Sequence, residues 1–342
     1  MMRLPRFSFV APASIAEAVD ALAAASPGDA MIVAGGTDLI PNMKRRQQTP
    51  GTLVSLRRVR ELREIRNGDG FAIGAGVTLS ELVERLRTSP PGFTVLRQAA
   101  QQVATPHLRN MGTIGGNLCL DTRCNYYDQN YEWRKAIDFC MKKDGKTCWV
   151  ATSSPKCLAV SSTDMAPALV SLGAAVTLRS AEGTRTIPIG ALYRNDGIAY
   201  LARRPNELLT TIEVPALTGW RSAYWKLRRR GSFDFPVLSV AASAKLAADG
   251  VVETARIVLG AVASCPIEVA SAAAALTGLP LTDAQIDAAA ELAAQPARPM
   301  DNTDFTLHWR KQMTRHFVRL ALQELRGDDL RSARYRISRQ LL

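Results

Sequence analysis

Hydrophobic and polar positions in the first 220 residues follow the patterns of short strands and helices. Apolar runs predict buried strands at residues 31–34, 52–56 and 71–73. Two capping boxes, Ser14-x-x-Glu17 and Thr78-x-x-Glu81, precede apolar residues at helical spacing, so we expect a surface helix after each. Later elements are expected as the end of a helix at 101–108, a helical turn from 166, and strands at 174–178, 184–189 and 211–214.

After residue 220 the pattern changes to long apolar strands and alanine-rich helices. Residues 237–246 and 251–262 predict two strands, and the dipeptide Asp249-Gly250 between them is a strong hairpin signal. Helices are expected at residues 267–276, 282–294 and 307–325. The pattern therefore predicts a mixed first unit and a separate α+β domain behind it.

The amino-acid composition limits the classes of protein to which this chain can belong. The 342 residues suffice for two or three packed units, and 47% hydrophobic with 22% charged residues is ordinary for a globular chain. The net charge of +12 raises the question of nucleic acid, but the basic residues are scattered and lack interleaved aromatic side chains. We expect instead a basic face that is solvated or docks acidic partner subunits. No apolar run reaches the roughly 18 residues of a membrane span, so no membrane contact is expected.

Four of the six cysteines, Cys124, Cys140, Cys148 and Cys157, lie in one short polar stretch. Disulfides need an oxidising compartment, and the first 25 residues read as an amphipathic helix rather than an export signal, so we expect reduced thiols in a cytoplasmic protein. The steps of 16, 8 and 9 residues contain no tight zinc knuckle, whereas iron–sulfur clusters tolerate irregular spacing. Zinc and unligated buried cysteines remain alternatives.

Lysines surround these cysteines and are expected to favour thiolate over thiol. They are Lys135, Lys142, Lys143, Lys146 and Lys156. Cys119 is expected to be no ligand because it lies too close to Cys124, and Cys265, which precedes a proline, is expected to serve packing.

Two glycine turns suggest a phosphate site. The first spans residues 34–39, directly after a predicted strand, and the second spans residues 113–117, directly ahead of the cysteines. Glycines let backbone N–H groups come close to phosphate oxygens. Neither turn matches G-x-G-x-x-G or a P-loop, so neither a Rossmann fold nor an NTPase is indicated. Two such turns suggest a pyrophosphate held from both sides, and ordinary tight turns are the alternative.

Both turns carry a family resemblance. Residues 33–41 (VAGGTDLIP) and 113–117 (TIGGN) resemble the FAD-binding subunits of the xanthine dehydrogenase and CO dehydrogenase molybdenum enzymes, and the resemblance covers essentially the whole chain. It implies an α+β protein. Residues 1–220 would form an FAD-binding fold of the molybdenum hydroxylase flavoprotein type, with two α/β subdomains at about 1–55 and 56–220. Residues 221–342 would form a C-terminal α+β flavoprotein domain.

Residues 118–161 depart from most members of this family, in which the second turn reaches a short acidic segment, here residues 162–167, after a few residues. The four clustered cysteines lie in this insertion. It resembles the insertion that carries an extra [4Fe–4S] cluster in the β subunits of 4-hydroxybenzoyl-CoA reductases. The resemblance implies that the cluster ligands are Cys124, Cys140, Cys148 and Cys157.

The resemblance also implies an FAD site. Backbone amides of the four loop glycines would meet the pyrophosphate, assisted by the hydroxyls of the two loop threonines. Asn117 and Asp164 would bind ribose, ribityl or ring atoms, and Lys226 would lie near the isoalloxazine. The alternatives are a helix N-terminal carboxylate for Asp164 and a solvated charge for Lys226. The residues expected to bind FAD are Ile32, Val33, Ala34, Gly35, Gly36, Thr37, Asp38, Leu39, Thr113, Ile114, Gly115, Gly116, Asn117, Asp164 and Lys226.

The implied enzyme is an oxidoreductase in aromatic degradation, a dimer of heterotrimers. Beside this chain it would contain a molybdopterin-binding large subunit and a small [2Fe–2S] subunit. Reduced ferredoxin would supply electrons to the [4Fe–4S] cluster, and FAD would pass them to molybdenum, where 4-hydroxybenzoyl-CoA is reduced to benzoyl-CoA with loss of water. Because the redox chemistry belongs to the cofactors, no catalytic residue is assigned. His107, His308 and His316 are expected to be surface or packing residues.

Three other functions remain open. A molybdenum hydroxylase or dehydrogenase acting on another aromatic substrate would have the same flavin site. A stand-alone flavin oxidase is disfavoured, because no substrate-facing side chain emerges near the loops and the cysteine insertion would have no role. A zinc-stabilised scaffold subunit would show no visible absorption, whereas flavin and iron–sulfur clusters absorb.

Overall fold

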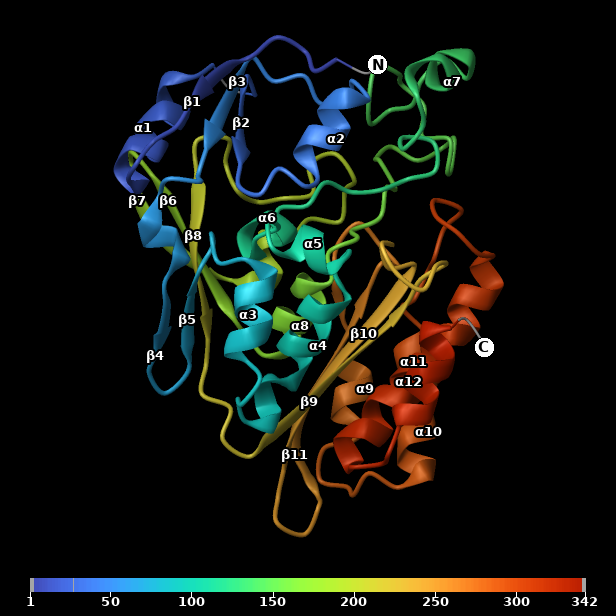
Figure 1. Ribbon diagram of the computed structural model, residues 1–342. Helices are drawn as coiled ribbons and strands as arrows, with labels where there is room; N and C mark the ends of the chain where they lie inside the picture. Colours follow the sequence, from blue (N-terminus) through green and yellow to red (C-terminus); the bar gives the residue numbers. More distant parts are fainter. Residues whose placement is uncertain (1–2, 27, 340–342) are drawn as a thin grey trace.

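Three β-sheets come from three consecutive stretches of the chain, as the computed structural model in Figure 1 shows. The structure describes residues 3–26 and 28–339. Helices accompany each sheet, which confirms the expected α+β class. In the described part of the chain, no helix combines the length and the apolar character needed to cross a membrane.

The first sheet is parallel, in the order β1-β3-β2. Its elements are β1 (Ser8–Val10), α1 (Ile15–Ala24), β2 (Ala30–Val33), α2 (Leu39–Lys44) and β3 (Thr52–Ser55). The first capping signal is confirmed in part: the Ser14 hydroxyl accepts from the Glu17 N–H at 3.1 Å, but the Glu17 carboxylate accepts from Ala13 rather than from Ser14. The first glycine turn links β2 to α2.

The second sheet is antiparallel, in the order β4-β5-β8-β6-β7. Its strands are β4 (Ile65–Asn67), β5 (Phe71–Gly74), β6 (Ala175–Ser180), β7 (Gly183–Pro188) and β8 (Leu208–Val214). Between β5 and β6 the chain forms α3 (Leu79–Arg85), α4 (Thr94–Gln102), α5 (Pro106–Arg109), α6 (Ile114–Leu118), α7 (Tyr131–Ala136) and α8 (Met165–Ser171). Of these helices, α3, α4, α6 and α8 contribute buried residues to the core of this sheet. The capping box at Thr78 and Glu81 is present in full.

The helix expected to end at 101–108 is in fact two helices. The first, α4, ends at Gln102, and α5 starts at Pro106. Ala104 between them has φ of +46°, a left-handed conformation that an α-helix does not continue through. The break turns the chain toward the second glycine turn.

The third sheet is antiparallel, in the order β12-β11-β10-β9. Its elements are β9 (Trp220–Leu227), β10 (Leu238–Leu246), β11 (Val252–Gly260), β12 (Ile267–Glu268), α9 (Ala270–Ala274), α10 (Asp283–Ala294), α11 (Leu307–Arg326) and α12 (Arg331–Ser338). The hairpin is confirmed, with Gly250 at φ +83° in its turn. The helix expected at 267–276 is shorter, because its first residues pair with β11 as β12. The last helix, α12, was not predicted.

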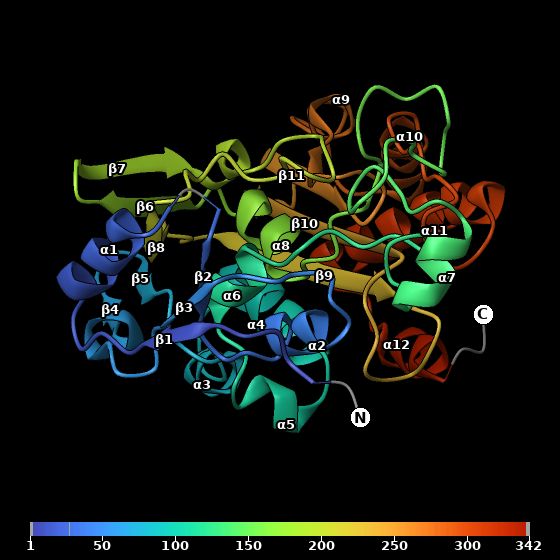
Figure 2. The same ribbon diagram turned by 90° about the horizontal axis from the view of Figure 1, so that it is seen from above.

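Helices cover both faces of this third sheet, and Figure 2 shows it between them. The C-terminal helices α9, α10 and α11 bury one face in their own core. The other face packs against α4 and α8, so that Tyr224, Ala241 and Val258 join the core of the second sheet. The C-terminal domain is thus joined to the rest by shared apolar core.

The insertion lies at one end of the molecule, beside α2 and the loops of the third sheet (Figure 1, green). Arg123 and Val160 close its base with two backbone hydrogen bonds of 2.8 and 2.7 Å. Within it the only helix among the described residues is α7. Most of the insertion is therefore irregular chain held by side chains.

Candidate functional site

The two glycine turns lie side by side. A Cβ on Gly35 would overlap the carbonyl oxygen of Met111, and one on Gly112 would lie 3.5 Å from the Thr37 hydroxyl. Glycine at position 35 is therefore required for the contact between the first turn and the segment that leads into the second. Two segments about 75 residues apart in the sequence thus form one loop pair, at the carboxyl end of β2.

The first turn presents free donors. The backbone N–H groups of Gly35, Gly36, Thr37 and Asp38 donate to no acceptor in the described residues. Gly36 has φ of +70°, a conformation that side chains rarely adopt. Successive N–H groups in such a turn, next to the start of α2, form a concave anion site. The first turn therefore offers free amides of the kind that bind a phosphate, and its contact with a pyrophosphate stays a prediction.

The second turn is built differently from the expectation. The N–H of Gly115 donates to the carbonyl of Ala75 at 2.9 Å, and the N–H of Gly116 donates to the Thr113 hydroxyl at 3.0 Å, which caps α6. These donors and the hydroxyl lone pair already have partners in the chain. Both amides therefore have partners within the chain, because the turn is the first turn of a helix, and their contact with the pyrophosphate stays a prediction.

Asn117 connects the second turn to the acidic segment. Its Oδ1 accepts from the Thr163 hydroxyl at 2.7 Å and from the Met165 N–H at 3.1 Å. Its side-chain nitrogen has no acceptor in the described part of the chain, so that nitrogen is the group left for a ligand. The remaining expected contacts, Ile32 to Ala34, Leu39 and Ile114, lie on the strand and helix ends beside the loop pair.

Asp164 and Lys226 form a buried ion pair. Lys226 Nζ lies 3.0 Å from Asp164 Oδ2 and also donates to the carbonyl of Gln102 at 3.0 Å. Tyr224 OH donates to the other carboxylate oxygen at 2.7 Å. Burial raises the pKa of Asp164 and lowers that of Lys226, and each partner opposes the shift of the other. The alternative for Lys226 is excluded, because this side chain is buried and not solvated. Asp164 does stand at the N-terminus of α8, as its alternative states, but its carboxylate makes no capping hydrogen bond there.

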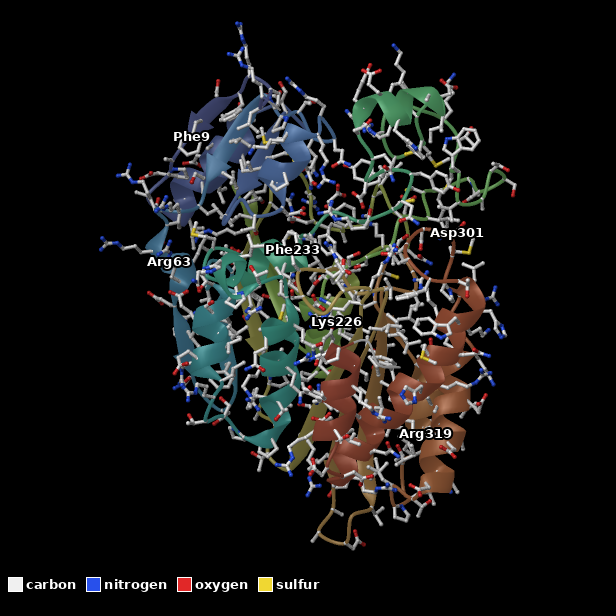
Figure 3. The ribbon with its side chains drawn as sticks, turned by 45° about the vertical axis from the view of Figure 1, so that its right-hand side comes forward. Phe9, Arg63, Lys226, Phe233, Asp301 and Arg319 are labelled. Carbon is white, nitrogen blue, oxygen red and sulfur yellow. The ribbon has the colours of Figure 1, made fainter. Side chains whose placement is uncertain are left out.

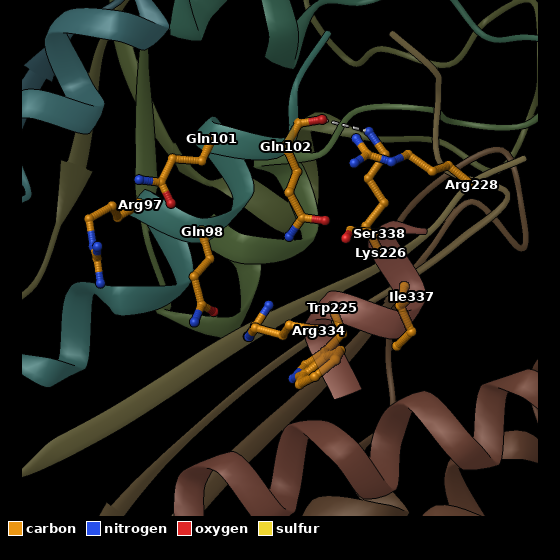
Figure 4. A pocket seen from close by; sticks show the side chains of 10 residues that line it. All are labelled: Arg97, Gln98, Gln101, Gln102, Trp225, Lys226, Arg228, Arg334, Ile337 and Ser338. Carbon is orange, nitrogen blue, oxygen red and sulfur yellow. Dashed lines mark hydrogen bonds between the residues drawn. The ribbon is translucent and has the colours of Figure 1, made fainter. Parts of the chain in front are cut away.

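A basic cavity flanks this pair, and Figure 3 shows Lys226 at the centre of the molecule. Its walls come from α4, β9 and α12 and include no acidic residue; the lining residues are Arg97, Gln98, Gln101, Gln102, Trp225, Lys226, Arg228, Arg334, Ile337 and Ser338. Figure 4 shows Arg97 and Arg228 at opposite sides of the cavity. Since these guanidinium groups do not converge, the cavity is a basic flank of the Lys226 region rather than a site for one small anion.

The four clustered cysteines come together. All four are buried and line one hollow inside the insertion, with aromatic and aliphatic neighbours. The backbone carbonyl of Cys157 accepts from the N–H of Gly197, and a Cβ on Gly197 would lie 2.6 Å from the Cys157 sulfur. Cys119 and Cys265 lie outside the hollow. The set of four thus forms one site although its members span 34 residues.

The lysines do not activate the thiols of Cys124 and Cys157 as expected. Burial raises the pKa of Cys124 to about 12 and that of Cys157 to about 11, although Lys142 lowers the latter. Lys142 is itself held by Asp121 at 2.7 Å and by Thr122 at 2.8 Å. Without a metal the desolvation of these thiols outweighs nearby positive charge, so a metal has to displace their protons on binding.

Two family models match consecutive parts of the chain. Residues 5–217 match the family model of the FAD-binding domain in molybdopterin dehydrogenases, and residues 222–325 match the CO dehydrogenase flavoprotein C-terminal domain. Together these models cover most of the chain.

Individual proteins that are similar to this chain support the same family as these models. The chain is 34% identical over 269 residues to the aldehyde oxidoreductase FAD-binding subunit PaoB of Escherichia coli K12, covering 75% of this chain and 82% of that one. It is 31% identical over 326 residues to the carbon monoxide dehydrogenase medium chain of Afipia carboxidovorans, covering 94% and 97%. The structure of reconstituted CO dehydrogenase from Oligotropha carboxidovorans aligns with a TM-score of 0.77 at 30% identity, covering 96% and 100%. The chain therefore belongs to the family of FAD-binding subunits of molybdenum hydroxylases and dehydrogenases.

Proposed function

We propose that this chain is the FAD and [4Fe–4S] electron-transfer subunit of a 4-hydroxybenzoyl-CoA reductase. The observation that carries the proposal is the hollow in which Cys124, Cys140, Cys148 and Cys157 meet beside the flavin-loop pair. Bound FAD and cluster would carry electrons between a one-electron donor and a molybdenum centre.

The spacing of the thiols favours a cluster over zinc. Within residues 3–26 and 28–339, no three His, Cys, Asp or Glu side chains are placed to hold a single metal ion. Thiolates on one tetrahedral zinc would lie about 3.8 Å apart, because each Zn–S bond is about 2.3 Å. Thiolates of a [4Fe–4S] cluster bind four different irons and stand further apart. Four buried thiols around one hollow, none grouped for a single ion, fit the second arrangement.

The residues of the chain would hold the two cofactors as follows. The amides of Gly35 to Asp38 would bind the pyrophosphate of FAD, with Thr37 beside them. The side-chain nitrogen of Asn117 would donate to FAD, and the pair of Asp164 and Lys226 would place one positive and one negative group near the ring. The domain boundaries that we propose are 1–55, 56–220 with the insertion at 118–161, and 221–342.

Membership of the family supports the two proposed partner subunits, whereas the electron donor and the assembly belong to the proposed reductase. The proposed partners are a molybdopterin-binding large subunit, a [2Fe–2S] small subunit and reduced ferredoxin, in a cytoplasmic dimer of heterotrimers. The six free cysteines suit a reducing compartment. The basic surface that accompanies the net charge of +12 suits acidic partners.

A second candidate is the FAD subunit of a hydroxylase or dehydrogenase that acts on another aromatic substrate. The names of two relatives favour it: the nicotine 6-hydroxylase medium subunit of Paenarthrobacter nicotinovorans and the nicotinate dehydrogenase FAD-subunit of Eubacterium barkeri. In that enzyme electrons would leave through this chain.

Cofactor content and substrate turnover test the proposal separately. This chain is expected to contain one FAD, about four irons and about four acid-labile sulfides, in addition to the iron and sulfide that the [2Fe–2S] subunit contributes to the purified complex. Stoichiometric zinc and no labile sulfide in this chain would refute the proposed cluster. With reduced ferredoxin, the complex is expected to convert 4-hydroxybenzoyl-CoA to benzoyl-CoA. A complex that contains the cluster but only oxidises an aromatic substrate would support the second candidate.

A further inference from the structure

Arg123 joins the flavin loop to the cysteine insertion. It directly precedes Cys124, and its side chain is only 6% exposed. Its guanidinium group pairs with the carboxylate of Asp38 in the first glycine turn and donates to Asn42 Oδ1 at 3.2 Å. Its backbone closes the base of the insertion against Val160. One residue of the insertion thus contacts the start of α2 from the cysteine side.

The same guanidinium group also faces a carboxylate that holds Cys124. Arg123 Nη1 lies 3.5 Å from Asp128 Oδ1, and Asp128 Oδ2 accepts the backbone N–H of Cys124 at 3.3 Å. The ring of Phe235, from the loop after β9, covers the guanidinium at 4.7 Å. Asp38 and Asp128 are therefore held on one cation, which lies between the phosphate loop and a proposed iron ligand.

The bridge depends on the shape of arginine. A guanidinium group presents several N–H donors in one plane and can bind two carboxylates and an amide at once, whereas a lysine offers one compact charge. The positive charge also offsets Asp38, whose carboxylate would otherwise repel a pyrophosphate on the neighbouring amides. Any shift of Asp128 that follows loss of the cluster therefore reaches the first glycine turn through this side chain.

We propose that Arg123 is a positioning residue that couples FAD binding to the presence of the cluster. The cluster half of this inference rests on the proposed function. Cluster formation fixes Cys124 and Asp128, and Arg123 then holds Asp38 and the first turn in the geometry that binds pyrophosphate. Coupling between binding sites is reciprocal, so bound FAD also stabilises the cluster.

The test is a double-mutant cycle read as the FAD dissociation constant. FAD is titrated into complexes from which the flavin has been removed and in which this chain is full length. Four forms of the chain are compared: wild type, Arg123→Lys, Cys148→Ser and the double variant. The iron content of each form is measured as well. Loss of the cluster in Cys148→Ser is expected to weaken FAD binding about fivefold or more, the lower range of measured couplings. In the Arg123→Lys background the same loss is expected to change the dissociation constant less than about twofold.

Arg134→Lys is the matched control. Arg134 is also a fully buried arginine of the insertion, but its ion pair is with Asp144 and it makes no contact with the first turn. It is expected to retain the dependence of FAD affinity on the cluster. Asp38→Asn breaks the same bridge from the loop side and is expected to behave like Arg123→Lys, which covers the case in which one variant does not fold.

The outcomes separate the inference from the proposed function. If wild type contains the cluster and Arg123→Lys shows the same cluster dependence as wild type, Arg123 does not couple the sites. If Cys148→Ser loses the iron and FAD affinity is unchanged in the wild-type background, no coupling exists. A wild-type complex with no iron beyond that of the [2Fe–2S] subunit would overturn the proposed cluster itself.

Discussion

The ammonium group of Lys226 and the carboxylate of Asp164 meet at 3.0 Å across the contact between the two matched domains. Asp164 stands at the start of α8 and Lys226 near the end of β9, and Tyr224, two residues earlier on the same strand, donates to the same carboxylate. Removing two charges from water is costly, so each depends on the other. The pair therefore joins the flavin part to the C-terminal domain at the place where the resemblance puts the flavin ring.

Breaking this pair is expected to destabilise the protein. Lys226→Met leaves the Asp164 carboxylate buried without its cation and is expected to lower the free energy of unfolding by about 3–5 kcal/mol. The double variant Asp164→Asn, Lys226→Met is expected to lose less, because no charge stays unpaired. Urea denaturation measures both. The exposed pair of Arg229 and Asp304 is the control, and Arg229→Ala is expected to cost less than about 1 kcal/mol.

Replacing Gly36 is expected to abolish FAD retention. The φ of +70° is unfavourable for valine, and its Cβ would lie 3.2 Å from Ile40, so the turn that presents the free amides would be distorted. Flavin absorbance of the purified Gly36→Val variant measures the loss, and most of its iron is expected to remain. Gly190→Ala is the matched control, since a Cβ there meets nothing within 4 Å. Normal flavin content in Gly36→Val would mean that the loop is only a turn.

Whether a cysteine variant keeps its iron is expected to depend on whether its thiol lines the hollow. Cys140→Ser and Cys148→Ser are expected to lose or alter the cluster, because their thiols line it. Cys119→Ser is expected to keep the iron of wild type, since that thiol lies outside. Iron and labile sulfide per chain are the measurements. Iron lost with Cys119 and kept with Cys148 would reverse the ligand assignment.

Electron supply is expected to separate the cluster from the flavin. In an assembled Cys148→Ser complex with excess FAD, reduction by a low-potential one-electron donor is expected to slow sharply. A dye that exchanges electrons directly with flavin is expected to support turnover, because the free amides of the first turn involve no thiol. Both rates are compared with those of Cys119→Ser. Undiminished donor-driven activity without the cluster would refute the electron-input role while leaving the ligands correctly named.

Local sequence determined most of the secondary structure and the identity of the site residues. Thr78 with Glu81 and the Asp249-Gly250 turn act through neighbours a few positions away, so their outcome is readable from spacing alone. The helix break at Ala104 was missed although the sequence marks a new helix there, with Thr105 as the capping residue and Pro106 at the first helical position. The arginine-rich α12 was also missed, since its Arg334 packs on Trp225 of β9, a distant segment of the chain, as well as pairing with Glu324 of the preceding helix.

The loop pair, the ion pair and the bridge at Arg123 were decided by tertiary structure. Which amides stay free depends on acceptors such as Ala75, which lies 40 residues from Gly115 and becomes its partner only when β5 and α6 pack together. Likewise, lysines near cysteines in sequence suggested thiolates, but burial dominates the pKa of Cys124 once the insertion closes around it. Spacing along the chain identifies which groups are present, whereas desolvation and the choice of partner arise only when separate segments exclude water together.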